Sequence, residues 1–142
     1  MKKFLVINGP NINMLGIREP DVYGKQTYHD LIKFIEASAN ELGCSATCFQ
    51  YNHEGEIVDK IQSALNIYDG IVINPAAYTH TSIAILDAIK AVGLPCVEVH
   101  ISDITQREDF RQISYAGLAC VEHFIGLGFE GYKKALEFLN NQ

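Results

Sequence analysis

A long loop near the start of the chain carries an arginine and a tyrosine five positions apart, Arg18 and Tyr23. A tyrosine with the ordinary pKa near 10 is ionised to only about one part in a thousand at pH 7, a deficit of roughly 4 kcal/mol. A neighbouring cation can lower such a pKa by about 1–3 units. The pair is therefore a way to make a phenolate, which is a strong base at neutral pH.

A second reactive pair closes a short apolar run at residues 96–100. Alternation along a strand puts Glu98 and His100 on one face, where the carboxylate can orient the imidazole and fix its tautomer. A lone histidine at a strand end is more often structural, but with this partner it becomes a candidate general acid or base. The turn that follows, Ile101 and Ser102, offers backbone N–H groups and a hydroxyl to a carboxylate.

A third polar segment, residues 74–82, follows the apolar run 70–73. Pro75 keeps Asn74 out of helical space, and a helix that begins near Thr79 would present free N–H groups to an anion. His80 lies in the same segment. A structural interpretation is equally consistent with this loop alone, with Asn74-Pro75 as a strand terminator and Thr79 as a helix cap.

The arginines are distributed unlike the lysines. Arg18, Arg107 and Arg111 all lie in expected loop regions, whereas the eight lysines are scattered over ends, helices and turns. Arginine suits planar, bidentate recognition of carboxylates. This acidic chain, with a net charge of −6, is therefore expected to bind a small anion.

Composition argues against several other classes of protein. The net charge of −6 disfavours a nucleic-acid surface, and no segment approaches the roughly 18 apolar residues of a membrane span. The short apolar run at the start does not resemble a signal peptide, so a soluble, cytoplasmic protein is expected. Cys44, Cys48, Cys96 and Cys120 show no metal-ligand spacing and are expected to be buried, reduced thiols.

One motif is misleading. Residues 126–131 match the G-x-G-x-x-G string of dinucleotide-binding proteins. Only eleven residues follow it, which leaves no later strand with an acidic residue for a ribose. The glycines are better explained by close packing of the last helix.

Hydrophobic periodicity predicts five repeats of strand then helix. We expect strands at 3–7, 45–51, 70–73, 96–100 and 120–125, and helices at 28–42, 54–67, 79–92 and 129–139, with a short helical stretch from 107 to about 113. Thr27 and Gly43 fit the start and stop of the first helix. The loop 8–24 between the first strand and this helix exceeds the usual 2–6 residues, which is typical of a functional loop.

This alternation predicts an α/β protein with one domain over residues 1–142. A five-stranded parallel sheet covered on both faces, in the flavodoxin-like three-layer order 2-1-3-4-5, is the expected arrangement. Ligands bind beyond the carboxyl ends of such strands. The loops after the first, third and fourth strands should therefore form one site.

Together these motifs closely resemble the type II 3-dehydroquinate dehydratases, over the whole chain. The resemblance rests on residues 7–11 (INGPN) with Arg18 and Tyr23-Gly24, 50–55 (QYNHEG), 73–75 (INP) through 80–82 (HTS), 98–102 (EVHIS) and 126–132 (GLGFEGY).

The resemblance implies a lyase that removes water from 3-dehydroquinate by anti elimination through an enolate, the third step of the shikimate pathway towards chorismate and aromatic amino acids. It implies no metal or other cofactor. Tyr23 would be the base, Arg18 the group that stabilises its phenolate, and His100 the acid, oriented by Glu98. Asn11 would hold a water near the enolate oxygen. The substrate's carboxylate and hydroxyls would be bound by Asn74, His80, Ile101, Ser102 and Arg111.

The resemblance further implies a homododecamer, a tetramer of trimers, in which Asp87 reaches a neighbouring subunit's site. If His80 and Asp87 share one helix, seven positions separate them by about 10 Å, too far for both to touch one small ring. That spacing favours the neighbour's site for Asp87. The alternative to an enzyme is a flavodoxin-like binding or signalling module that only recognises an anion.

Four residues stand out from this pattern. Ala76 lies where many members of the family have glycine, and Asp103 where asparagine is frequent. A negative Asp103 beside an anion site is expected to pair with Arg107. Glu122 and His123 are unusual in a buried strand and suggest an exposed edge or a contact between subunits.

Overall fold

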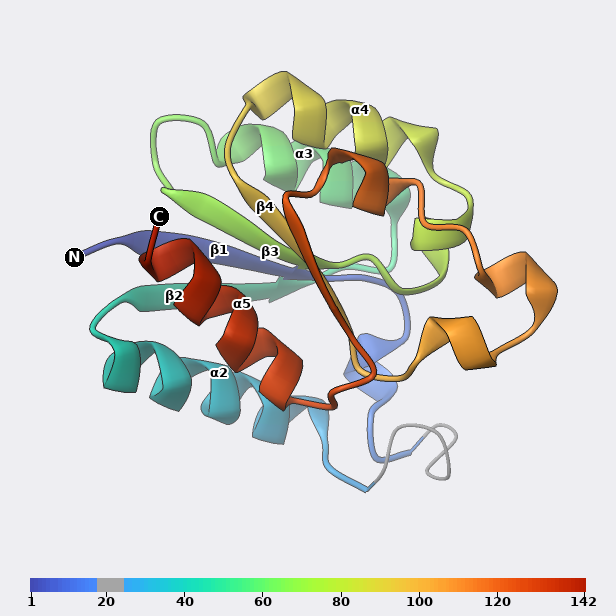
Figure 1. Ribbon diagram of the computed structural model, residues 1–142, viewed down its shortest axis with the longest axis horizontal. Coiled ribbons are helices and arrows are strands. Elements are labelled where there is room, and N and C mark those ends of the chain that lie inside the picture. Colours follow the sequence, from blue (N-terminus) through green and yellow to red (C-terminus); the bar gives the residue numbers. More distant parts are fainter. Residues whose placement is uncertain (18–24) are drawn as a thin grey trace.

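The structure is a computed structural model, and it describes residues 1–17 and 25–142. Within these ranges, parallel strands form one sheet in the order β2-β1-β3-β4-β5 (Figure 1). The strands are β1 (Lys3–Asn8), β2 (Ser45–Gln50), β3 (Gly70–Asn74), β4 (Cys96–His100) and β5 (Glu122–Ile125). The predicted flavodoxin-like architecture and strand order are confirmed.

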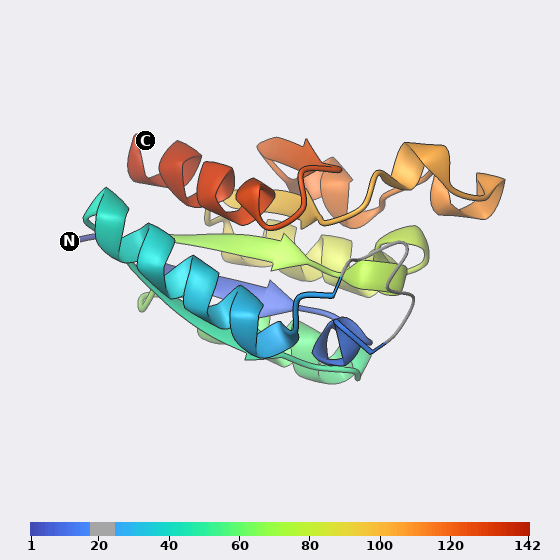
Figure 2. The same cartoon turned by 90° about the horizontal axis from the view of Figure 1, so that it is seen from below.

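Helices cover both faces of the sheet. Helices α2 (Tyr28–Leu42) and α5 (Glu130–Asn140) lie on one face, and α3 (Glu54–Ser63) and α4 (Ile83–Val92) on the other (Figures 1 and 2). Alternate residues of the central strands supply one core under each layer: Val97 and Val99 of β4 face α5, and Cys96 faces α4. This alternation puts Glu98 and His100 on the face of α3 and α4.

The first helix begins and ends where the sequence predicts. Thr27 Oγ1 accepts a hydrogen bond from the Asp30 N–H at 3.1 Å, and Asp30 Oδ2 accepts one from the Thr27 N–H at 2.9 Å. Gly43 ends the helix in the left-handed region at φ 77°. Because a capping box satisfies two free N–H groups, it fixes where the chain leaves the long loop and enters α2.

The long loop packs locally at its start. A 3₁₀ helix, η1 (Ile12–Met14), follows β1, and the side chains of Ile12 and Leu15 are buried, while Met14 and Ile17 are exposed. Gly9 is required here, because a Cβ at this position would lie 2.4 Å from the carbonyl oxygen of Pro75. The loop after β1 is thereby held against the loop after β3.

The expected helix from Thr79 is wrong at its start. Residues Ala76–His80 form a 3₁₀ helix, η2, and α4 begins at Ile83 with Ser82 as its cap, whose Oγ accepts from the Ile85 N–H at 2.9 Å. His80 and Asp87 therefore lie on different elements, and the argument that placed them on one helix does not hold.

The segment after β4 also differs from expectation. In place of one helical stretch it contains three 3₁₀ helices, η3 (Ile104–Gln106), η4 (Asp109–Arg111) and η5 (Ala116–Ala119). The helix expected to reach residue 67 ends at Ser63, and the strand expected from residue 120 begins at Glu122.

Two remaining sequence expectations concern cysteines and membranes. All four cysteines are free, with Cys44 and Cys96 buried and Cys48 and Cys120 half-buried. Across the described ranges, none of the helices has the length and apolar character needed to cross a bilayer.

Candidate active site

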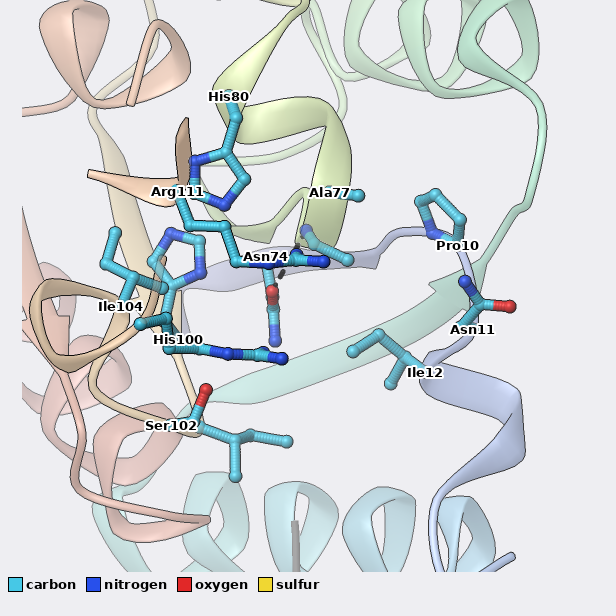
Figure 3. Close-up of a pocket in the computed structure, with 13 residues that line it drawn as sticks. Pro10, Asn11, Ile12, Asn74, Ala77, His80, His100, Ser102, Ile104 and Arg111 are labelled. Carbon is cyan, nitrogen blue, oxygen red and sulfur yellow. Dashed lines mark hydrogen bonds between the residues drawn. The ribbon is translucent and has the colours of Figure 1, made fainter. Parts of the chain in front are cut away.

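A pocket opens at the carboxyl ends of β1, β3 and β4. Its lining residues come from the three loops that the sequence analysis expected to meet: Pro10, Asn11, Ile12, Asn74, Ala76, Ala77, His80, His100, Ile101, Ser102, Ile104, Arg107 and Arg111. Figure 3 shows His80, His100 and Arg111 on one side, facing Pro10 and Asn11 on the other. One wall of the site therefore carries arginine and imidazole groups, and the start of the long loop forms the opposite wall.

The two end residues of β4 form the pair that alternation predicts. Nε2 of His100 lies 2.7 Å from Oε2 of Glu98, and both side chains are buried. An ionised carboxylate can only accept, so Nε2 carries the hydrogen. Nδ1 is then the ring nitrogen left for a ligand.

Glu98 has more partners than the sequence suggests. Oε2 also accepts hydrogen bonds from the Ser114 hydroxyl and, at 3.1 Å, from the Thr79 hydroxyl. Oε1 lies 2.7 Å from Nδ1 of His123. Burial by itself raises the pKa of Glu98, but the hydrogen bonds from His100, Ser114 and His123 outweigh it and lower the pKa to about 2. Glu98 is therefore a buried anion at neutral pH.

This ionisation makes a testable contribution to stability. The folded-state pKa is about 2 against an ordinary 4.5, so the contribution is present above pH 4.5 and is lost as the pH falls towards 2. The full shift corresponds to about 3 kcal/mol. We expect the stability advantage of the wild type over Glu98→Gln, measured by denaturant unfolding, to shrink across this window. A difference independent of pH between 6 and 2.5 would contradict the assignment.

His80 is held as a neutral hydrogen-bonding group. Its Nδ1 lies 2.8 Å from the carbonyl oxygen of Ile113, so Nδ1 is the donor and Nε2 remains available at the pocket. Burial lowers the pKa of His80, and the nearby His100, Arg111 and Arg107 lower it further, although the bond to Ile113 opposes them. Such a group suits recognition of a substrate hydroxyl more than proton transfer.

A buried polar network fixes Asn74 at the floor of the pocket. Its Nδ2 donates to the Tyr132 hydroxyl at 2.9 Å, which donates to Oδ1 of Asn8 at 2.6 Å. Its Oδ1 accepts from the Ala76 N–H at 3.1 Å. One hydrogen of Nδ2 is left for a ligand. Tyr132, fully buried on α5, was not predicted as a supporting residue.

Ala76 adopts a backbone conformation that is more usual for glycine. Its φ is 53°, in the left-handed region, which costs a residue with a Cβ about 1–2 kcal/mol. The bond from its N–H to Asn74 helps to hold the turn in place.

The side of the pocket that carries the arginines is formed after β4. Ile101, Ser102, Arg107 and Arg111 lie at the pocket, and Nε of Arg111 donates to Oε2 of Glu108 at 2.7 Å, which orients the guanidinium. Asp103 caps η3, its Oδ1 accepting from the N–H and hydroxyl of Thr105. Its pairing with Arg107 stays a prediction.

Among the candidates that the structure describes, Asp87 and Glu98 are not pocket-lining residues. Arg18 and Tyr23 lie outside the described residues. Asp87 is exposed on α4. Asn11 is at the pocket in the left-handed region with φ 71°, its N–H bonded to Oδ1 of Asn52 at 3.1 Å. The structure therefore brings together seven of the eleven candidates at the pocket, and Glu98 directly behind it.

The order of the sheet and the pocket at its carboxyl edge define a flavodoxin-like α/β protein with an arginine-containing pocket. Residues 2–140 match the family model for class II dehydroquinases. The chain therefore belongs to the class II dehydroquinase family and is an enzyme of the 3-dehydroquinate dehydratase type.

Individual relatives match this chain over nearly its full length. A 3-dehydroquinate dehydratase from Caldicellulosiruptor saccharolyticus is 57% identical, covering 96% of this chain and 94% of the relative. One from Clostridium acetobutylicum is 53% identical, covering 98% and 96%. The crystal structure of a type II dehydroquinase from Butyrivibrio crossotus superposes with a TM-score of 0.96 at 48% identity, covering 98% and 97%.

Proposed function

We propose that the chain dehydrates 3-dehydroquinate to 3-dehydroshikimate through an enolate, with Tyr23 as base and His100 as acid. The observation that carries this proposal is the buried Glu98–His100 pair at the edge of an arginine-containing pocket. Glu98 holds Nε2 of His100 at 2.7 Å and leaves Nδ1 as the free ring nitrogen. With His100 as the acid, Nδ1 gives its proton to the departing hydroxyl.

The elimination balances with these two groups. The Tyr23 phenolate takes the proton next to the ketone, and the electron pair of that C–H bond forms the enolate. The enolate then collapses, the carbon–oxygen bond of the leaving hydroxyl breaks, and His100 supplies the proton that turns the hydroxyl into water. Tyr23 ends protonated and His100 neutral, so Tyr23 must lose one proton and His100 must regain one before the next turnover.

The other pocket residues would hold the substrate in place. Ser102 and the backbone of Ile101 would receive the carboxylate beside Arg111, whose guanidinium is oriented by Glu108. Asn74 and His80 would bind ring hydroxyls through their remaining Nδ2 hydrogen and Nε2. Asn11, on the opposite wall, would hold a water near the enolate oxygen.

The activity is tested by adding 3-dehydroquinate to the purified protein and following absorbance of the conjugated enone. Turnover with saturation kinetics supports the proposal. Calorimetric binding of 3-dehydroquinate without enone formation would favour the alternative, an anion-binding or signalling module.

We further propose that the active form is a homo-oligomer, a homododecamer built as a tetramer of trimers, with Asp87 serving a neighbouring subunit. Asp87 is exposed on α4 and does not line its own chain's pocket. Ile83 lies one turn earlier on the same helix face and is 56% exposed, and η5, which packs beside α4, exposes Leu118. Exposed apolar side chains around a carboxylate are typical of a protein interface.

This shared site makes a prediction that a mixture of inactive variants can test. Asp87→Ala and His100→Ala are each expected to be impaired, the first through the neighbour's site. When the two variants are co-expressed, some sites receive His100 from one chain and Asp87 from the other, so activity should recover partially. Sedimentation of each variant verifies that assembly is intact. Absence of recovery in verified hybrids would place Asp87 in its own chain's site or in none.

A further inference from the structure

His123 is the second imidazole in contact with Glu98, and the proposed reaction leaves it without a role. It lies on the edge strand β5, and its side chain is 41% exposed. In the parallel pairing of β4 with β5, Glu98 and His123 are direct partners. Paired residues point to the same face of a sheet, so the register itself brings the imidazole to the carboxylate.

The two oxygens of Glu98 are held separately. Oε2 accepts from His100, Ser114 and Thr79, whereas Oε1 has His123 Nδ1 at 2.7 Å. On the side of η5, the backbone of Gly117 lies so close that a Cβ there would be 2.6 Å from Oε1. Backbone on one side and a donor on another therefore define the position of Oε1.

We propose that His123 is a positioning residue for the dehydration, which holds Oε1 of Glu98 so that Oε2 stays directed at His100. The inference rests on the proposed role of His100 as the acid. Without the bond to Oε1, the carboxyl group can rotate about its last torsion, because terminal carboxyl torsions are broad. Rotation would move Oε2 away from Nε2 of His100 and change the direction of the ring.

A proton relay from solvent through His123 does not fit the same contacts. A proton that passes through Glu98 would arrive at Nε2 of His100, which already carries one. The proton lost in the reaction comes from Nδ1, on the other side of the ring. His123 therefore acts by orientation and not by supplying the proton.

The test compares His123→Val with His123→Asn. Valine suits an exposed strand position but has no donor, whereas the Nδ2 of asparagine can occupy nearly the place of histidine Nδ1. For histidines that ligate metals, loss of the group that orients the ring costs about 10–100-fold. We expect the lower end here, about tenfold in kcat for His123→Val with KM nearly unchanged, since Oε2 keeps its donors. His123→Asn should retain most of the wild-type kcat.

Controls separate this inference from the function on which it rests. His29 lies on the exposed side of α2. The variant His29→Val should leave kcat unchanged, which shows that replacing an exposed histidine with valine does not by itself reduce activity. If His100→Ala is inactive but His123→Val has wild-type kcat, the positioning role is refuted and the proposed function stands. The same holds if His123→Asn is as impaired as His123→Val. If His100→Ala turns over normally, both proposals fall.

Discussion

Replacing His100 with alanine is expected to lower kcat by about 10²–10⁴-fold, the range that a positioned general acid contributes. KM should change little, because the substrate's carboxylate and ring hydroxyls are assigned to other residues of the pocket. The structural reason is the arrangement of the ring, in which Nε2 is fixed by Glu98 and Nδ1 is the nitrogen left for the leaving hydroxyl. Steady-state kinetics by enone absorbance measure both constants.

His80→Ala is the matched control for that experiment. Both imidazoles lie at the pocket, and each has one nitrogen bonded to the protein, but His80 is bonded to the neutral carbonyl of Ile113 and its pKa is lowered, chiefly by burial. His80 is assigned to a ring hydroxyl, so its loss should raise KM more than it lowers kcat. If instead His80→Ala showed the larger loss of kcat and His100→Ala the larger rise in KM, the two roles would have to be exchanged.

The fold was predictable because its signals are local. Each central strand is a short apolar run, and each helix shows apolar residues at helical spacing, so alternation alone gives the parallel sheet and its order. The Glu98–His100 pair was predictable for the same reason, because its contact follows from the two-residue period of a single strand. The start of α4 was predicted wrongly because Thr79 and Ser82 are both good caps, and the 3₁₀ turn after Pro75 delays the helix until Ser82.

The remaining partners of Glu98 could not be predicted, because they depend on distant segments. Ser114 is 16 positions from Glu98 along the chain, and His123 is 25. Ser114 is brought to Glu98 by a series of 3₁₀ helices, which have no hydrophobic periodicity in the sequence. His123 is brought there by the register of the edge strand β5. Asn74 and Tyr132 meet across 58 positions in the same way. A pattern can identify a reactive pair, but the supporting contacts are set by tertiary structure.

The largest effect outside the described residues is expected for Tyr23→Phe, which removes the phenolic oxygen and leaves no base. Loss of a general base costs about 10²–10⁴-fold in kcat. Arg18→Ala keeps the hydroxyl but removes the cation that would ionise it. If Arg18 lowers the pKa of such a tyrosine by about 1–3 units, its loss reduces the ionised fraction, and with it kcat, by about 10–1,000-fold. KM should change far less, since the substrate's carboxylate is assigned to Arg111 and Ser102, which line the pocket.

Chemical rescue distinguishes a charge effect from a loss of structure. Free guanidinium ions at millimolar concentration should restore part of the kcat of Arg18→Ala, because a cation in the vacated space again stabilises the phenolate. They should not restore Tyr23→Phe, which has no group to ionise. Equal recovery of both variants would mean that guanidinium acts elsewhere, and no recovery of Arg18→Ala together with a large rise in KM would make Arg18 a substrate-binding residue. The phenolate mechanism requires that only Arg18→Ala respond, and that the response appear in kcat.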